Sequence, residues 1–505
     1  MAVINSILSW LMKKRMHQIN LFMQYPYEVQ QEWLRRLVDT AKDTEWGLKY
    51  GYSSIKTEAD FKRLVPIVEY DDLKPYIDRH RKGEPDVLWP GEILWFAKSA
   101  GTTGDKSKYI PVSQESLDEC HFKGGKDMLT LYCNSFPETH LFDGKTLSLA
   151  GTYRQDEGNV YARNGDLSAI LMENLPMWAE FFRSPDRYIA LMSEWEEKMD
   201  KIADAIMNEY MTCVSGVPSW MLVLLKHTLS KSGKKNIAEM WPGLEAFFHG
   251  GMNFNPYREQ YKELFSPLKV NFWEVYNASE GFFGIQDSPD RNDMLLMLDY
   301  GIYYEFIPVE NIAQRSPALT LSEVKTGISY ALIISTTGGL WRYMIGDTIQ
   351  FTSTDPFRFI ITGRVRQFIN AFGEELIMDN AENGIRAACE RTGAVVTEYT
   401  AAPVYMKGDA KGAHEWLIEF EKEPENIAYF TEILDNALKA LNSDYEAKRY
   451  KDMTLTLPVI RVLPNGTFFS WMKQRGKLGG QNKVPRLAND RKFVDDILKL
   501  VEQKA

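Results

Sequence analysis

The chain has 505 residues, of which 44% are hydrophobic and 25% charged, and its formal net charge is -10. A chain of this length is predicted to form two or three domains rather than one core. Its acidic balance gives no electrostatic basis for binding nucleic acid or an anionic membrane surface. No run of about 18 apolar residues occurs, so we expect no membrane span.

The N-terminus differs from a secretory signal, because its apolar residues precede the basic run 13–15 instead of following it. The chain has neither a Cys-x-x-Cys pair nor a Cys/His cluster with zinc spacing. We therefore expect free thiols and a cytoplasmic location. The cysteines are Cys120, Cys133, Cys213 and Cys389.

In chain order, the first 50 residues are predicted to be helical. A short apolar run at 93–97 indicates a buried strand, and a polar loop separates it from a second strand at 108–112. Helices are expected at 114–134 and 186–232.

Short apolar runs without helical periodicity follow these helices, and they are typical of buried strands. Together with the helices they predict an α/β domain around a largely buried sheet. The predicted strands are 247–253, 269–276, 301–307, 330–335 and 341–345.

The pattern changes near Gly363–Arg364, where we expect a domain boundary that divides the chain into residues 1–363 and 364–505. The second part is predicted to be a smaller α+β domain. Its expected helices are 380–392, 426–442 and 490–503, and its expected strands are 395–400, 415–420 and 459–463.

A loop rich in Gly, Thr, Ser and Lys, residues 99–108, follows the first predicted strand. Glycines let the backbone turn so that its N–H groups point inward, and hydroxyl and lysine side chains add donors and positive charge. Such a loop is suited to bind a polyphosphate. It is not a Walker A loop, because that motif does not fit and a strand rather than a helix follows. The alternative is a plain hairpin turn.

Two further strands are predicted to end in small or polar residues. One ends at His249-Gly250-Gly251, where paired glycines allow a flat ring to approach the backbone. The other ends at Tyr276–Gly281, where Tyr276 is suited to stack on or hydrogen-bond a base. In the same segment Glu280 offers a carboxylate of the kind that magnesium prefers. Simple turns and a surface glutamate remain the alternatives, and His249 alone is more typical of packing than of catalysis.

Asp347 follows Gly346 at another predicted strand end, where a carboxylate can accept two hydrogen bonds from ribose hydroxyls. A turn aspartate is the alternative interpretation. Near the C-terminus, the Gly-rich segment 479–486 carries Lys483 and Arg486. It is either a functional mobile loop or a solvated basic one.

Taken together, these segments resemble the adenylate-forming superfamily of acyl-CoA synthetases and luciferases. Within it, the chain resembles the Gretchen Hagen three family of acyl acid–amido synthetases, first known from plants. The resemblance rests on Ser-x-Gly-Thr-Thr at 99–103, Tyr-x-x-Ser-Glu at 276–280 and Tyr-x-x-Gly-Asp at 343–347. Residues 481–486 resemble a Gln-Tyr-Lys-x-Pro-Arg segment, with Asn in place of Tyr, and the third motif has one residue more than in some members.

The resemblance implies an α/β adenylation domain and a C-terminal lid, with ATP and Mg²⁺ bound between them. It implies a small carboxylic acid and an amino acid or other amine as substrates. Glu280 is the implied magnesium ligand and Lys483 the implied catalytic lysine, with Lys477 as the alternative. The implied nucleotide-binding residues are Ser99, Gly101, Thr102, Thr103, Gly104, Lys106, Gly250, Gly251, Tyr276, Ser279, Glu280, Tyr343, Asp347 and Arg364.

The acid pocket is less clearly marked. Val217, Trp220 and Arg154 lie in segments suited to line it, although ordinary core packing explains them equally well. A lysine and a magnesium ion offset the repulsion between a carboxylate and the α-phosphate, so the chemistry needs no nucleophilic Ser or Cys.

Three other activities fit part of the pattern. They are an acyl-CoA ligase, which shares the first step, a phosphotransferase that releases ADP, and a nucleotide sensor without catalysis. The sequence leaves the acid, the amine and the oligomeric state open.

Overall fold

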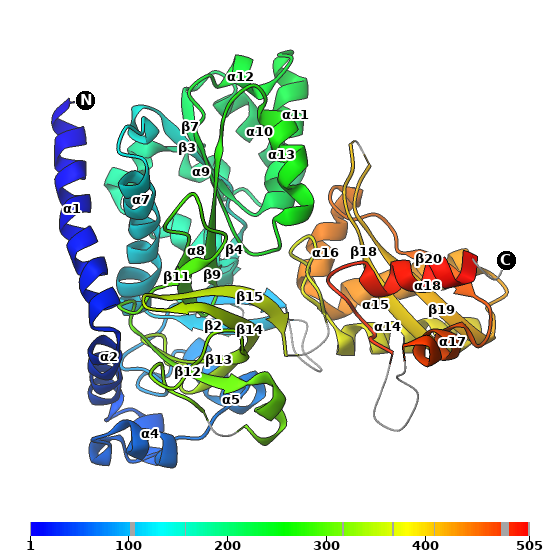
Figure 1. Ribbon diagram of the computed structural model, residues 1–505, viewed down its shortest axis with the longest axis horizontal. Helices are drawn as coiled ribbons and strands as arrows, with labels where there is room; N and C mark the ends of the chain where they lie inside the picture. The colour runs from blue at the N-terminus through cyan, green and yellow to red at the C-terminus, as the bar shows by residue number, and fades with distance from the viewer. Residues whose placement is uncertain are drawn as a thin grey trace.

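The computed structural model describes residues 2–100, 107–156, 158–315, 318–365, 368–408, 410–475 and 484–502. Figure 1 shows a large N-terminal part, which contains the elements up to β15, beside a smaller C-terminal part that begins after it. The fold class predicted from the sequence, a large α/β part with a smaller α+β part, is confirmed. The division at residue 363 stays a prediction.

The N-terminal helices are α1 (Ala2–Gln24), α2 (Pro26–Ala41) and α3 (Glu45–Lys49), so the predicted helical start is confirmed. Helix α2 begins with proline at its first position, where the missing N–H leaves no bond unmade. It buries one apolar face, formed by Trp33, Leu34, Leu37 and Val38.

A large mixed sheet runs through the N-terminal part. Strand β9 is parallel to β8 on one side and antiparallel to β10 on the other, so the sheet changes there from parallel to antiparallel pairing. The carboxyl ends of the parallel strands β3, β7, β8 and β9 meet at one edge. In sheet order the strands are β12 (Ile302–Pro308), β13 (Ser329–Thr336), β14 (Tyr343–Thr354), β15 (Phe357–Arg364), β11 (Met294–Leu296), β10 (Gly281–Ile285), β9 (Asn271–Ala278), β8 (Ala246–His249), β7 (Met211–Gly216), β3 (Lys145–Ser148) and β6 (Arg183–Ser184).

Helices cover both faces of the parallel half of this sheet (Figure 1). On one face, α7 (Lys123–Ser135) packs Tyr132 against Trp273 of β9. On the other, α13 (Arg258–Phe265) packs Tyr261 against Phe247 of β8, beside α10 (Trp195–Ile206) and α11 (Pro218–Ser232). Aromatic side chains therefore fill both layers of the core.

The helical prediction for 186–232 is wrong in its middle, where β7 separates α10 from α11. Residues 211–214 of this strand are all buried. A strand that is covered on both faces loses the polar–apolar alternation that would distinguish it from a helix.

A second sheet carries the glycine-rich loop. Strand β1 begins two residues later than predicted and pairs antiparallel with β2, so that Ala100 lies opposite Ser107. The loop 101–106 connects these two residues and lies outside the described residues. The strands are β2 (Ser107–Val112), β1 (Trp95–Ala100), β5 (Arg163–Gly165) and β4 (Tyr153–Gln155).

The C-terminal part begins with a short hairpin and continues around a three-stranded sheet. All the strands predicted here are present, whereas α16 and α17 were not predicted from the sequence. The elements are β16 (Phe368–Ile369), β17 (Leu376–Ile377), β18 (Val395–Val404), β19 (Ala413–Lys422), β20 (Val459–Leu463), α14 (Met378–Thr392), α15 (Ile427–Leu441), α16 (Ser443–Arg449), α17 (Thr467–Gln474) and α18 (Lys492–Glu502).

One connected apolar cluster spans both parts of the molecule. It joins Phe247 and Tyr257 of the large part to Ile369, Phe372 and Trp416 of the smaller one. The two parts are therefore packed against each other and not merely linked. Within the described residues, no helix is both long and apolar enough to cross a membrane.

Candidate active site

The edge where the parallel strands end brings several of the predicted residues together. Gly250 and Gly251 directly follow β8, while Ser279 and Glu280 form the turn between β9 and β10. Ligand sites of open α/β sheets lie at this edge. The sheet topology thus accounts for why residues from separate motifs are neighbours.

Asp347 on β14 is the centre of a hydrogen-bonded cluster. The Tyr276 hydroxyl on β9 donates to its Oδ2 at 2.5 Å, and Arg364 Nε on β15 donates to its Oδ1 at 2.7 Å. Strand register sets this geometry, because Asp347 and Arg364 are direct partners on adjacent antiparallel strands. Tyr343, at the start of β14, is fully buried in the core of the large part.

Arg364 links this cluster to the C-terminal part. Its Nη1 donates to Glu375 Oε2 at 3.2 Å, and its guanidinium lies 5.3 Å from the Phe368 ring centroid. Burial alone would lower the pKa of this guanidinium, but Glu375 and Asp347 raise it well above its usual value. Arg364 therefore remains charged and bridges two carboxylates.

Glu280 is a half-buried carboxyl beside Lys108 of β2. Burial raises its pKa to about 7, with Lys108 opposing that shift and the carboxylates of Glu375 and Asp347 adding to it. Burial likewise lowers the pKa of Lys108, against the opposing effect of Glu280. The sequence motif included Lys108 without assigning it a role.

Two glycines follow β8 at positions where a larger residue would clash or be strained. A Cβ on Gly250 would lie 2.3 Å from the carbonyl oxygen of Val275, so only glycine fits. Gly251 has φ +81, a conformation that favours glycine. His249 stacks on Phe254 with 3.9 Å between ring centroids, and burial lowers its pKa to about 3. The ring is neutral and packs in the core, as the sequence suggested.

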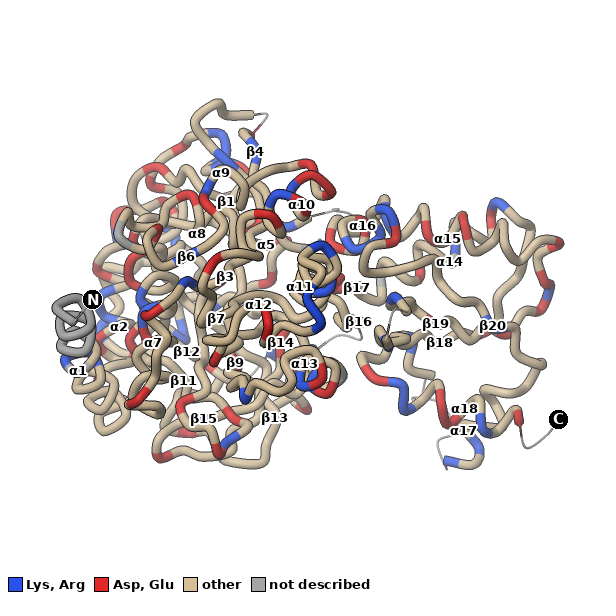
Figure 2. Tube along the Cα trace, turned by 90° about the horizontal axis from the view of Figure 1, so that it is seen from above, with Lys and Arg blue, Asp and Glu red and all other residues tan. Residues whose placement is uncertain are grey.

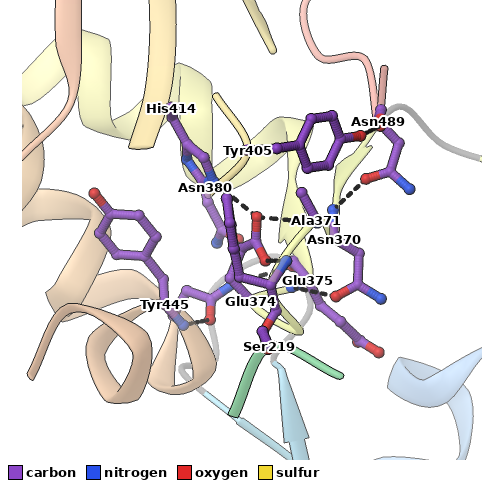
Figure 3. Close-up of polar contacts among 12 residues, drawn as sticks. Ser219, Asn370, Ala371, Glu374, Glu375, Asn380, Tyr405, His414, Tyr445 and Asn489 are labelled. Atoms are coloured by element: carbon purple, nitrogen blue, oxygen red, sulfur yellow. Dashed lines mark hydrogen bonds and ion pairs between the residues drawn. The ribbon is translucent and has the colours of Figure 1, made fainter. Parts of the chain in front are cut away.

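The turn between β16 and β17 joins the two parts of the molecule, as Figure 3 shows. Glu374 is fully buried and accepts hydrogen bonds from the backbone N–H groups of Ala371 and Phe372, at 3.2 and 2.6 Å. His414 Nε2 on β19 lies 2.7 Å from its Oε1. The carboxylate thus fixes both the shape of the turn and its attachment to the three-stranded sheet.

Hydrogen bonds to backbone carbonyls also attach this turn to the large part. Ser219 Oγ donates to Phe372 O at 2.9 Å, and Tyr257 OH donates to Ala371 O at 2.9 Å. In addition, Asn370 Nδ2 donates to Gly251 O at 3.1 Å. The sequence contained a turn signal at Gly373-Glu374-Glu375, but nothing in it showed which glutamate points inward.

The remaining predicted residues are dispersed or undescribed. Val217 and Trp220 lie at the start of α11, whereas Arg154 is exposed on β4. Ser99 is half-buried at the end of β1. The other predicted residues lie outside the described residues; they are Gly101, Thr102, Thr103, Gly104, Lys106, Lys477 and Lys483.

Residues 484–487, immediately after the predicted catalytic lysine, are attached to β18. Thr400 Oγ1 donates to Pro485 O at 2.6 Å, and Ala401 N donates to Arg486 O at 2.9 Å. Lys483 therefore adjoins a segment that belongs to the C-terminal part.

Comparison with known families identifies the class of protein. The GH3 family N-terminal domain matches residues 15–270, the central domain 295–364 and the C-terminal domain 379–492. The chain belongs to the GH3 family, and the resemblance to Gretchen Hagen three proteins inferred from the sequence is confirmed.

Two curated relatives illustrate the range of that family. The chain is 26% identical to the indole-3-acetic acid-amido synthetase GH3.3 of Arabidopsis thaliana, with 91% of this chain and 89% of that protein covered. It is 24% identical to the 4-substituted benzoates-glutamate ligase GH3.12 of Arabidopsis thaliana, covering 91% and 92%.

Solved structures share the fold across both parts. AtGH3.15 acyl acid amido synthetase in complex with 2,4-DB aligns with a TM-score of 0.60 at 18% identity, covering 94% of this chain and 93% of that one. A 2-hydroxyisobutyryl-CoA ligase in complex with 2-HIB-AMP and CoA aligns with a TM-score of 0.56 at 14% identity, covering 94% and 92%. The chain thus shares the overall fold of these two proteins.

Proposed function

We propose that this protein is an ATP-dependent acyl acid–amido synthetase. It activates a carboxylic acid as an acyl-adenylate with release of pyrophosphate, and then transfers the acyl group to an amine, in the simplest case an amino acid. The named GH3 relatives are amido synthetases and ligases that join acids to amino acids, which supports this reaction class. The cytoplasmic location remains a prediction from the sequence.

The observation that carries the proposal is the cluster of Asp347, Tyr276 and Arg364 at the sheet edge. A carboxylate held between a phenol and a guanidinium is pre-organised to accept hydrogen bonds from the two hydroxyls of a ribose. Gly250 and Gly251, which follow β8 at the same edge, are the candidates to lie beside the adenine ring. Tyr343, buried at the start of the same strand as Asp347, is retained among the candidate nucleotide-binding residues.

The β1–β2 loop is assigned to the phosphates. Ser99 stands where the loop begins, and Gly101, Thr102, Thr103, Gly104 and Lys106 supply donors within it. Lys108, at the other end of the loop, brings a cation toward Glu280.

Glu280, next to Ser279, is the proposed magnesium ligand. Among the described residues, no group of three or more His, Cys, Asp or Glu side chains is placed to hold a metal. One protein carboxylate completed by phosphate oxygens and water is the usual arrangement for a magnesium–nucleotide complex, so the donor set fits. Bound there, the ion would neutralise negative charge on the phosphates.

Lys483 is the proposed catalytic lysine, with Lys477 as the alternative. An acid carboxylate attacking the α-phosphorus brings negative charges together, and a lysine there stabilises the charge that develops. Because residues 484–487 are attached to β18, the C-terminal part would carry Lys483 toward or away from the nucleotide. Val217, Trp220 and Arg154 are retained as candidates for binding the substrates.

The decisive experiment is ATP–pyrophosphate exchange across a panel of acids, followed by product analysis. We expect acid-dependent exchange, AMP rather than ADP, and an amide when an amine is added. ADP as the product would identify a phosphotransferase and overturn the proposal. A thioester formed with coenzyme A, and no amide with any amine, would identify an acyl-CoA ligase.

A further inference from the structure

Helix α16 places two charged side chains at the junction of the two parts. Asp444 and Lys448 are four residues apart and so lie on one face of the helix. The Lys448 ammonium lies 4.6 Å from the ring centroid of Trp220 in α11. Figure 2, seen from above, shows α16 at this junction. A residue of the C-terminal part thus meets one of the candidate substrate residues.

Among the described residues, neither charged side chain has a hydrogen-bond or ion-pair partner in direct contact; Lys448 stacks on Trp220, and the two groups interact with each other only at longer range. Both side chains are half-buried. Holding two charges away from bulk water with no directly bonded partner is unfavourable. A ligand that carries both signs of charge would supply the missing partners.

This pair lies close to the proposed reaction centre. Ser107 Oγ, directly after the phosphate loop, donates to Ser443 Oγ at the start of α16, at 3.1 Å. On the other side, a Cβ on Gly373 would lie 3.4 Å from Lys448 Nζ. The next residues in that turn lead to Glu375, which binds Arg364 of the nucleotide cluster. The pair is therefore flanked by Ser107, the first described residue of β2, and by the turn that joins the two parts.

Burial has the largest effect on the pKa of both groups. Burial raises the pKa of Asp444 to about 7, an effect that Glu375 reinforces and Lys448 opposes. Burial lowers the pKa of Lys448, which Asp444 and Asp166 oppose.

We propose that Lys448, Trp220 and Asp444 form the acceptor site, and that the acceptor is an amine carrying its own carboxylate, that is, an amino acid. Lys448 binds the carboxylate, the Trp220 ring packs against the carbon skeleton, and Asp444 binds the ammonium. This inference rests on the proposed amide-forming function and deepens it. Trp220 then belongs to the acceptor rather than to the acid pocket.

The reaction balances with these groups. The acceptor ammonium first gives one proton to the Asp444 carboxylate and becomes a nucleophilic amine. Its nitrogen forms a bond to the acyl carbon, and the bond from that carbon to the adenylate oxygen breaks. AMP leaves with the electron pair, and the second amine proton passes to water. No oxidant or other co-reactant is required.

The Lys448→Gln variant tests the acceptor site independently of the adenylation site. With the best amino acid found in a panel, we expect kcat/KM for amide formation to fall about thirtyfold or more, mainly through the KM of the amino acid. ATP–pyrophosphate exchange should stay within about twofold of wild type, because the first step does not use the acceptor.

The sharper comparison uses the decarboxylated amine that corresponds to the same amino acid. Because this amine has no carboxylate for Lys448 to bind, the variant and the wild type should convert it at similar rates. Lys448→Arg should restore most of the activity with the amino acid. Lys451→Gln is the matched control: it removes one positive charge and an ion pair with Glu196 across the same junction, and should change neither reaction.

Each of the following results would overturn the inference. An equal loss with the amino acid and its decarboxylated amine would mean that Lys448 does not bind the carboxylate. An equal loss of pyrophosphate exchange, or a lowered unfolding temperature that accounts for the loss, would make the Trp220 contact a structural clamp. Unchanged amide formation would exclude the site. Failure of the wild type itself to show exchange or amide formation would instead refute the proposed function.

Discussion

The cluster around Asp347 and the residues that follow Lys483 are held in place by different means. Asp347 and Arg364 are register partners on the adjacent strands β14 and β15, and Tyr276 of β9, in the same sheet, reaches Asp347 through its hydroxyl. Lys483 instead adjoins a segment attached to β18 of the other part. The proposed ribose contacts thus rest mainly on one sheet, whereas the proposed chemistry depends on how two parts meet. Variants in the two regions should therefore fail in different ways.

Lys483→Ala is expected to have the largest effect. Removing a lysine that stabilises charge at the α-phosphate should lower pyrophosphate exchange by about a hundredfold to a thousandfold, with little change in ATP affinity. A synthetic acyl-adenylate given to the variant should still yield amide at nearly the wild-type rate. Lys473→Ala, an exposed lysine of α17, serves as the control. Normal ATP–pyrophosphate exchange in the Lys483 variant would make Lys477 the candidate for the catalytic lysine.

Glu374→Ala tests the joint between the regions. The change leaves two buried N–H groups and His414 without their acceptor, so the free energy of unfolding should fall by about 3 kcal/mol. Glu374→Gln keeps an acceptor oxygen and should lose less. Denaturant unfolding of both variants measures this, and a loss below about 1 kcal/mol for the alanine variant would show that the joint is not held by this carboxylate.

Asp347→Ala should weaken ATP binding rather than slow the chemical step. Ribose contacts are present in both the ground and transition states, so the KM for ATP should rise about tenfold to a hundredfold at nearly constant kcat. Tyr276→Phe, which removes one hydroxyl, should give a smaller rise. Steady-state kinetics in ATP decide this, and a large fall in kcat at unchanged KM would contradict the ribose assignment.

The ionisation of Glu280 should make the apparent affinity for magnesium depend on pH. Its pKa of about 7 means that the carboxyl is mostly protonated below that value and ionised above it. Because magnesium binds the ionised form, its apparent affinity should fall by up to about tenfold for each pH unit below 7 and level off above it. Titrating Mg²⁺ at saturating ATP measures this. Glu280→Gln should retain only the pH dependence of ATP itself, and an identical profile in the variant would remove Glu280 from the metal site.

Local sequence was sufficient where a strand end itself forms the site. Gly250 and Glu280 could be selected because each follows the apolar run of a parallel strand, and parallel strands bring such ends to one edge. Asp347 was selected as a strand end too, but it lies inside β14, which is antiparallel to both of its neighbours. The same reasoning failed at 211–216, since a strand buried on both faces has no alternation to read.

Contacts between distant segments could not be predicted. Glu374 and Glu375 are adjacent and chemically alike, yet one is buried against His414 and the other binds Arg364. Lys448 meets Trp220 only because two parts of the chain pack together. Such pairings depend on tertiary packing, which no local pattern encodes.

The apolar cluster that spans both parts has a calorimetric consequence. If the C-terminal part reorients between the two half-reactions, side chains such as Phe372 must leave some of their present neighbours and meet water. Exposing apolar surface raises the heat capacity. The heat-capacity change on forming the enzyme-bound adenylate would then include this contribution beyond that of the ligand's own burial. Titration calorimetry at several temperatures would thereby detect the movement without any label on the protein.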